Sequence, residues 1–169
     1  MLIKSVRGFT PKYGIDCFFA ENSTIIGEVI MGDNCSVWYQ AIIRGDVNSI
    51  EIGNCVNIQD GAVVHGTYEQ SGTKIGNHAS VGHNAIIHGC TIEDSVLVGM
   101  GSIIMDDSVI ESNSIIAAGS VLPKNTIVPK GSVFAGVPAK KIKEIDLGLK
   151  EGEIDRIANN YLTYASWFK

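Results

Sequence analysis

Bulky apolar residues recur at every sixth position through most of the chain. The register runs from Phe19 to Phe134. It skips three residues after Ile43, skips five after Val64 and loses one after Ile87. The positions that keep it are Phe19, Ile25, Met31, Val37, Ile43, Ile52, Ile58, Val64, Ile75, Val81, Ile87, Ile92, Val98, Ile104, Ile110, Ile116, Leu122, Val128 and Phe134. A smaller residue lies four positions after most of them, and this even separation points both side chains to the same side of a strand. The pattern is therefore a hexapeptide repeat.

The hexapeptide repeat predicts a parallel β-helix with three flat faces, because three repeats make one coil of about 18 residues. We expect about six coils, which stack at about 4.8 Å each to a length of roughly 29 Å. The residues inserted after Ile43 and Val64 are then expected to bulge outward as loops. An all-β fold also agrees with the many β-branched residues and the 19 glycines.

The repeat ends after Phe134, where the segment GVPAK follows and Pro138 interrupts the last rung. We assign residues 1–138 to the β-helix domain and residues 139–169 to a linker and one amphipathic helix. Apolar residues recur at helical spacing from about Lys150 to Phe168. We expect this helix to pack on a face of the β-helix; a helix that only caps the β-helix or bridges subunits is the alternative.

Charge and cysteine usage narrow the possible partners and location. The net charge is −5 and no basic run occurs, which argues against nucleic acid and anionic membranes as partners. No apolar stretch approaches the roughly 18 residues of a membrane-spanning helix, and the N-terminus has no run typical of a signal peptide. The four cysteines form no C-x-x-C pair. We therefore expect reduced cysteines and a cytoplasmic protein.

All four histidines lie between His65 and His88. In the predicted coils, the residues that follow the interior positions of one face form a first column: Arg44, His65, His88 and Met105. A second column, on another face, contains Tyr39, Asp60, His83 and Met100. His65 and His88 are thus neighbours in adjacent coils, about 5 Å apart at the backbone. This spacing suits two ligands of one metal ion, whereas His78 lies near a corner and receives no role.

His83 is predicted on a different face from His65 and His88, so it cannot easily reach this pair within one β-helix. The five residues from His83 to His88 span up to roughly 16 Å when extended, whereas three nitrogens on one metal ion lie within about 3–3.5 Å of each other. A neighbouring copy related by a threefold axis could supply His83. We therefore predict a cyclic homotrimer with metal sites at its interfaces. Histidines that are merely solvated at the surface are the alternative.

Three segments, RGD, NIQDGAVVH and GHNAIIHG, occur in an order that resembles the γ-class carbonic anhydrases and their close relatives. The resemblance extends from about residue 10 through the C-terminal helix. Its three-histidine pattern is specific, whereas GVPAK and the hexapeptides are shared with unrelated acyltransferases. It implies a left-handed β-helix and a homotrimer whose interfaces hold Zn²⁺, or Co²⁺ or Fe²⁺ in its place. The ligands it assigns are His65, His83 and His88.

The resemblance also implies roles for other residues and a reaction. Gln59 would hydrogen-bond the metal-bound hydroxide, and Tyr161 would reach the site from the helix. Arg44, Asp46 and Asp60 would form an ion-pair network across the interface, or only join the subunits. The hydroxide would convert carbon dioxide to bicarbonate.

The chain departs from the fuller members of this family at the proton-transfer step and is closer to a short-loop subgroup. Val47 stands where those members have a glutamate, and the short loop after His65 carries only Glu69 as an acidic residue. Two other classes of function therefore remain as alternatives. One is an acyl-CoA enzyme, either a hexapeptide acyltransferase with a histidine base or a thioesterase. The other is a non-catalytic assembly subunit that retains the metal site.

Overall fold

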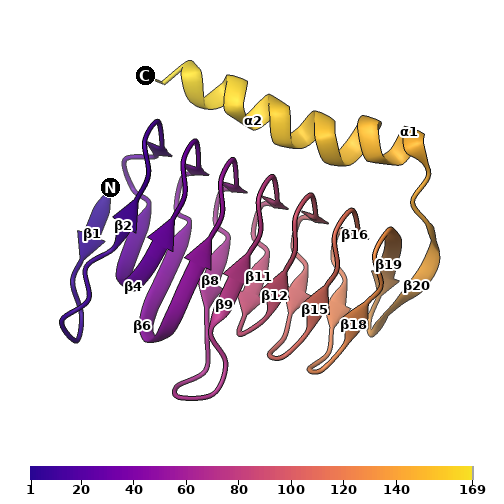
Figure 1. Cartoon of the computed structure of the whole chain (residues 1–169), viewed down its shortest axis with the longest axis horizontal. Helices are drawn as coiled ribbons and strands as arrows, with labels where there is room; N and C mark the ends of the chain where they lie inside the picture. Colours follow the sequence, from indigo (N-terminus) through magenta and orange to yellow (C-terminus); the bar gives the residue numbers. More distant parts are fainter. Residues whose placement is uncertain (169) are drawn as a thin grey trace.

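The computed structural model describes residues 1–168, which form a parallel β-solenoid of about seven turns with a C-terminal helix (Figure 1). The predicted parallel β-helix is confirmed. The expected number of about six coils was too low, because residues before Phe19 also form rungs. Strands β1 (Leu2–Lys4) and β2 (Lys12–Tyr13) both pair in parallel with β4 (Thr24–Met31).

Two sheets form the walls of the β-helix. The 12-stranded sheet contains β1, β2 and β4 together with β6 (Ile42–Ile52), β8 (Val63–His65), β9 (Thr73–Ile75), β11 (Ile86–His88), β12 (Thr91–Ile92), β14 (Ile103–Ile104), β15 (Val109–Ile110), β17 (Val121–Leu122) and β18 (Ile127–Val128). The 8-stranded sheet contains β3 (Phe18–Phe19), β5 (Ser36–Val37), β7 (Asn57–Ile58), β10 (Ser80–Val81), β13 (Leu97–Val98), β16 (Ile115–Ile116), β19 (Ser132–Gly136) and β20 (Ala139–Glu144). We call the part of the first sheet formed by β8, β11, β14, β17 and the start of β6 the histidine face. The 8-stranded sheet is called the helix face.

The interior of the β-helix is filled by the residues of the six-residue register. Every one of these positions is buried except Phe19, which is partly buried against the same cluster. The smaller residues four positions later are mostly buried too, and most of their polar members hydrogen-bond to the backbone. The Ser102 hydroxyl, for example, donates to the Ala117 carbonyl at 3.0 Å. Among the described residues, the buried Ser132 hydroxyl has no partner. The predicted core is therefore confirmed.

One corner of the β-helix is closed by a ladder of Asp and Asn side chains. Asn54 Oδ1 accepts from the Asp33 backbone N–H at 2.8 Å, and Asn77 Oδ1 accepts from the Asn54 N–H at 2.9 Å. A Cβ added to Gly53 would lie 2.8 Å from Asn77 Oδ1. His78 also lies at this corner, in the left-handed backbone conformation with φ 54°. The ladder satisfies backbone donors that no strand partner reaches.

Of the two insertions in the repeat, only the one after Val64 forms the expected loop. The residues after Ile43 form no loop, because β6 continues to Ile52 and pairs with β4 over most of its length. This long bend is possible because Gly27 and Gly45 face each other, and a Cβ on Gly45 would lie 2.4 Å from the Glu28 carbonyl oxygen. The insertion after Val64 does project as a loop, closed by an antiparallel bridge between Thr67 and Ser71 (Figure 1).

The C-terminal segment begins with a strand rather than a plain linker. Strand β20 pairs antiparallel with β19 and so extends the helix face. A continuous helix follows, made of α1 (Leu147–Leu149), the π-helical segment η1 (Lys150–Asp155) and α2 (Arg156–Ser166). The helix begins three residues before the predicted start. In the described part of the chain, no helix is long and apolar enough to cross a membrane.

The helix packs on a face of its own β-helix, which is the first of the two arrangements considered from the sequence. Near its start, Ile154 is buried against Ile115 and Val133 of the last coils. Near its end, Ala165 packs on Phe18 and Trp38 of the first coils. The helix therefore lies along the whole length of the β-helix and covers the helix face (Figure 1).

Candidate metal centre on the histidine face

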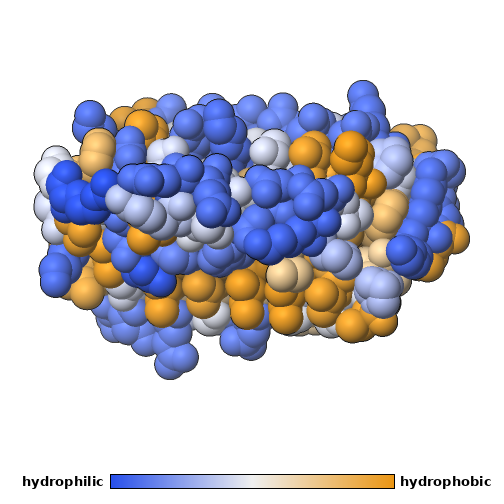
Figure 2. All heavy atoms as spheres, turned by 90° about the horizontal axis from the view of Figure 1, so that it is seen from below, coloured by the Kyte–Doolittle hydropathy of each residue, from blue (hydrophilic) through white to orange (hydrophobic). Residues whose placement is uncertain are grey.

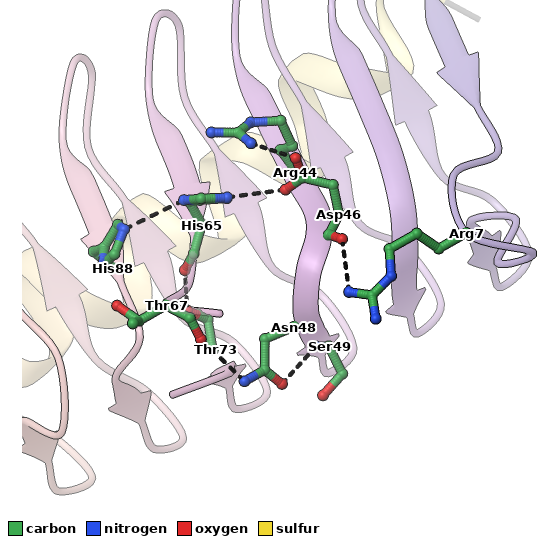
Figure 3. A network of polar contacts seen from close by, with 9 residues as sticks. All are labelled: Arg7, Arg44, Asp46, Asn48, Ser49, His65, Thr67, Thr73 and His88. Atoms are coloured by element: carbon green, nitrogen blue, oxygen red, sulfur yellow. Dashed lines mark hydrogen bonds and ion pairs between the residues drawn. The ribbon is translucent and has the colours of Figure 1, made fainter. Parts of the chain in front are cut away.

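His65 and His88 are neighbours on the histidine face, as the column of the repeat predicted. They end strands β8 and β11 and lie directly opposite each other in the ladder register. Nδ1 of His65 lies 3.3 Å from Nε2 of His88, and Figure 3 shows the two rings pointing toward each other. This separation falls within the range of about 3–3.5 Å expected for two nitrogens on one tetrahedral metal ion.

A carboxylate binds the remaining nitrogen of each imidazole. Asp46 Oδ1 lies 3.0 Å from His65 Nε2, and Asp106 Oδ1 lies 2.7 Å from His88 Nδ1. Ionised carboxylates only accept hydrogen bonds, so the imidazoles are the donors in both pairs. When both rings are neutral, their two lone pairs then face each other across 3.3 Å. A shared cation satisfies this arrangement, and carboxylate–histidine pairs of this kind support metal-ligating imidazoles.

Asp46 is the centre of a polar network at the first coils of the histidine face (Figure 3). Arg44 Nη1 lies 2.5 Å from Asp46 Oδ2, and Arg7 Nη1 donates to the Asp46 carbonyl at 3.3 Å. Desolvation raises the pKa of the Asp46 carboxyl, but the hydrogen bonds from His65 and Arg44 outweigh it and hold that pKa below its ordinary value. Asp46 is therefore an anion at neutral pH.

Asp106 has a similar role beside His88, and the sequence reading missed it. Lys124 Nζ lies 2.8 Å from Asp106 Oδ2, and Thr67 Oγ1 donates to Asp106 Oδ1 at 3.1 Å. Desolvation raises the pKa of Asp106, but hydrogen bonds from Lys124, His88 and Thr67 outweigh it and lower the pKa overall. A signal was present, since Asp106 directly follows Met105, the last member of the predicted column.

His83 belongs to a second cluster at the edge of the helix face. It follows β10, and its Nδ1 lies 2.9 Å from Asp60 Oδ2. The Tyr161 hydroxyl, from α2, lies 3.3 Å from His83 Nε2, and Gln59 Oε1 accepts from the His83 backbone N–H at 3.2 Å. Desolvation, aided by Asp60, raises the pKa of Tyr161 to about 12, so its hydroxyl stays protonated at neutral pH.

The two clusters do not combine into one site within a single chain. Across residues 1–168, no three His, Cys, Asp or Glu side chains are placed to hold a metal ion together. Arg44 and Asp46 pair with each other on the histidine face, whereas Asp60 pairs with His83. The chain thus offers two imidazoles on one face and a third imidazole on another, which is the division the sequence predicted.

Aliphatic side chains line the histidine face next to His65 and His88. They occupy one outward position per coil, in direct strand register, and form what we call the aliphatic stripe: Ile42, Val63, Ile86, Ile103 and Val121. Ile42, Ile86 and Ile103 are exposed. Figure 2 shows that apolar residues gather in a row along the molecule between hydrophilic borders. A contiguous apolar stripe of this kind is typical of a protein–protein interface.

A cavity of about 430 Å³ lies between α2 and the helix face, beside the second cluster. His83, Gln59 and Tyr161 line one part of it, while Leu97, Ile116 and other apolar residues of the helix face line another. The cavity can therefore admit a molecule much larger than a single water next to His83.

Asp46→Asn is expected to reduce the stability of the metal-free protein in a pH-dependent way. The native pKa lies below the ordinary value of about 3.9, so the unfolded state binds the extra proton as the pH falls. The stability from Asp46 is complete above about pH 5 and disappears as the pH falls through the native pKa. We expect the variant to be about 1 kcal/mol less stable at pH 7. Urea unfolding from pH 7 to 3 with a chelator measures this, and an equal difference at both ends would contradict it.

Comparisons with known proteins identify the repeat and the relatives of the chain. A family model described as bacterial transferase hexapeptide (six repeats) matches residues 89–124. A protein of Methanocaldococcus jannaschii named "Probable carbonic anhydrase" is 48% identical over 145 residues, which is 86% of this chain and 88% of that protein. The carbonic anhydrase of Geobacillus kaustophilus is 37% identical over 99% of this chain and 91% of its own length.

The solved structures include a hexapeptide transferase family protein from Anaplasma phagocytophilum with a TM-score of 0.94. It is 38% identical, and the match covers 99% of this chain and 98% of that one. The fold and the repeat thus define a hexapeptide-repeat protein. Within this class, the chain belongs to the γ-class carbonic anhydrase-like family, as the sequence resemblance indicated.

Proposed function

We propose that this protein is a zinc-dependent, carbonic anhydrase-like enzyme that converts carbon dioxide to bicarbonate reversibly at the interfaces of a homotrimer. The observation that carries the proposal is the pair of facing imidazoles, His65 and His88, each hydrogen-bonded to a carboxylate. Neutral imidazoles with such partners are ligands that zinc prefers. Relatives named carbonic anhydrase, at 37–48% identity, support the same activity.

A third ligand would come from His83 of a second copy. Asp60 accepts from Nδ1 of His83, so Nε2 carries the lone pair. In the single chain this nitrogen faces the Tyr161 hydroxyl at 3.3 Å, a contact that a metal ion on Nε2 would replace. The aliphatic stripe beside His65 and His88 supports an interface at this place, because its burial would remove apolar surface from water. Bound zinc, or cobalt or iron in its place, would supply Lewis acidity that makes a water molecule nucleophilic at neutral pH.

The residues around His83 would orient the reactants. Gln59 is buried and held from two sides, since its Nε2 donates to Asn57 Oδ1 at 2.9 Å and its Oε1 accepts from His83. Tyr161 keeps its proton and can donate a hydrogen bond beside His83. Val47 and the short loop leave Glu69 or external buffer to carry the proton away, so we expect slow turnover.

Acyl transfer or thioester hydrolysis is the second candidate. The likeness to the Anaplasma transferase family protein favours it, and so does the cavity beside His83, which is much larger than carbon dioxide requires. In that reaction a histidine would act as general base on a hydroxyl, amine or water nucleophile. This candidate needs one histidine, however, and gives no role to the facing pair.

The decisive experiment combines metal analysis, gas hydration and coenzyme binding on the wild-type protein. We expect about one zinc ion per chain after purification without added metal, stopped-flow hydration of carbon dioxide above the buffer rate, and no binding of acetyl-CoA by calorimetry. Metal without hydration would identify an assembly subunit that retains the site. Tight binding of acetyl-CoA without hydration would favour the acyl-CoA enzyme.

A further inference from the structure

We infer that Asp106 is a positioning residue that fixes the His88 imidazole with Nε2 directed at His65. This inference deepens the proposed function and rests on its metal site. An imidazole can present either nitrogen, and the hydrogen bond made by one nitrogen decides which of the two keeps its lone pair. Because Asp106 accepts from Nδ1 of His88 at 2.7 Å, Nε2 carries the lone pair.

The Asp106 carboxylate is immobilised from several directions. Its side chain is only 8% exposed. Besides His88, Oδ1 receives the Thr67 hydroxyl at 3.1 Å, and Oδ2 lies 2.8 Å from Lys124 Nζ. The low exposure and the contacts to both oxygens favour the orientation of the carboxylate toward His88. The His88 ring is therefore oriented before any metal ion binds.

The local backbone is adapted to this contact. Gly89 follows His88 with φ 58°, and a Cβ at this position would lie 2.2 Å from Asp106 Oδ1. Any other residue would thus collide with the carboxylate. Thr67 belongs to the loop that follows His65, so this loop connects the coil of one candidate ligand to the carboxylate that holds the other. Another hydroxyl of the loop, on Ser71, donates to Asp107 at 2.6 Å and fastens the loop beside the same turn.

His65 lacks an equally fixed partner. Its carboxylate, Asp46, is 25% exposed at the side chain and is shared with Arg44, which is itself 41% exposed. The two carboxylates therefore differ: Asp106 is the more buried, at 8% against 25%, and it also receives the Thr67 hydroxyl. We therefore expect loss of Asp106 to change the His88 tautomer, and to weaken zinc binding through both the lost orientation and the lost negative charge.

The test compares Asp106→Ala and Asp106→Asn with the matched control Asp107→Asn, which changes the adjacent carboxylate that touches no histidine. In metal-free protein with ¹⁵N-labelled histidine at pH 8, long-range proton–nitrogen spectra report which imidazole nitrogen is protonated. We expect wild type and Asp107→Asn to hold His88 as the Nδ1–H form, and Asp106→Ala to lose this preference. Asp106→Asn keeps the side-chain volume and one acceptor oxygen, so we expect a smaller change in the same direction.

Zinc affinity, measured by chelator competition, is the second readout. We expect Asp106→Ala to bind zinc about 10–100-fold more weakly than wild type, with Asp107→Asn unchanged. An unaltered His88 tautomer and unaltered affinity in both Asp106 variants would overturn the inference. If wild type binds no zinc, the proposed function fails, but the spectra of the metal-free protein still decide whether Asp106 orients His88.

Discussion

His88→Ala is expected to remove zinc from the protein and to lower the rate of carbon dioxide hydration more than about 100-fold. Loss of a residue that only supports a ligand costs roughly 10–100-fold in affinity or activity, and loss of the ligand itself should cost more. The variant also leaves His65 without its facing partner at 3.3 Å. Elemental analysis and stopped-flow hydration measure the two effects on the same sample.

His78→Asn is the control for this substitution. His78 lies at a corner in the left-handed backbone conformation, which asparagine also tolerates. We expect this variant to retain zinc and hydration at the wild-type level. Retention of a full zinc complement in His88→Ala, or its loss in His78→Asn, would contradict the assignment of the site.

If the proposed homotrimer forms, Ile86→Glu is expected to convert it to monomers and to lose the zinc that the interfaces would hold. Ile86 lies in the middle of the aliphatic stripe, two residues before His88, and is exposed in the single chain. A glutamate here costs little in a monomer, whereas three glutamates buried at the interfaces would remain without a partner charge. Light scattering gives the mass, and elemental analysis of the same peak gives the zinc content.

Ile127→Glu provides the comparison, because Ile127 is 63% exposed on β18, outside the histidine face. We expect this variant to remain a zinc-containing trimer. A monomeric wild-type protein at neutral pH would refute the trimer, and a trimeric Ile86→Glu would show that the aliphatic stripe is not the interface.

The periodic part of the molecule could be predicted from the sequence, because each interior residue fixes the position of the next coil. Ile87 and Val64 lie opposite each other in the ladder, so His88 and His65 must also be neighbours. The division between the histidine face and His83 followed from the same register.

The remaining features depended on contacts that a period does not describe. The insertion after Ile43 became part of β6 because Gly27 and Gly45 allow two backbones to approach closely. The presence of a glycine in the sequence does not by itself predict which residue it will pair with. Asp106 reaches His88 because Gly89 leaves room for its carboxylate and Thr67 meets it from a distant loop. Such side-chain reach across coils is not encoded in the spacing of apolar residues.

The helix that lies across every coil has a consequence for how the molecule unfolds. Stacked-repeat proteins contact mainly their nearest neighbours, so their end repeats can fray without disturbing the centre. Here Ile154 is anchored at the last coils and Ala165 at the first, so neither end can open without releasing a tether shared with the other. The helix therefore couples the first coils to the last, and we expect the whole β-helix to unfold in one cooperative transition.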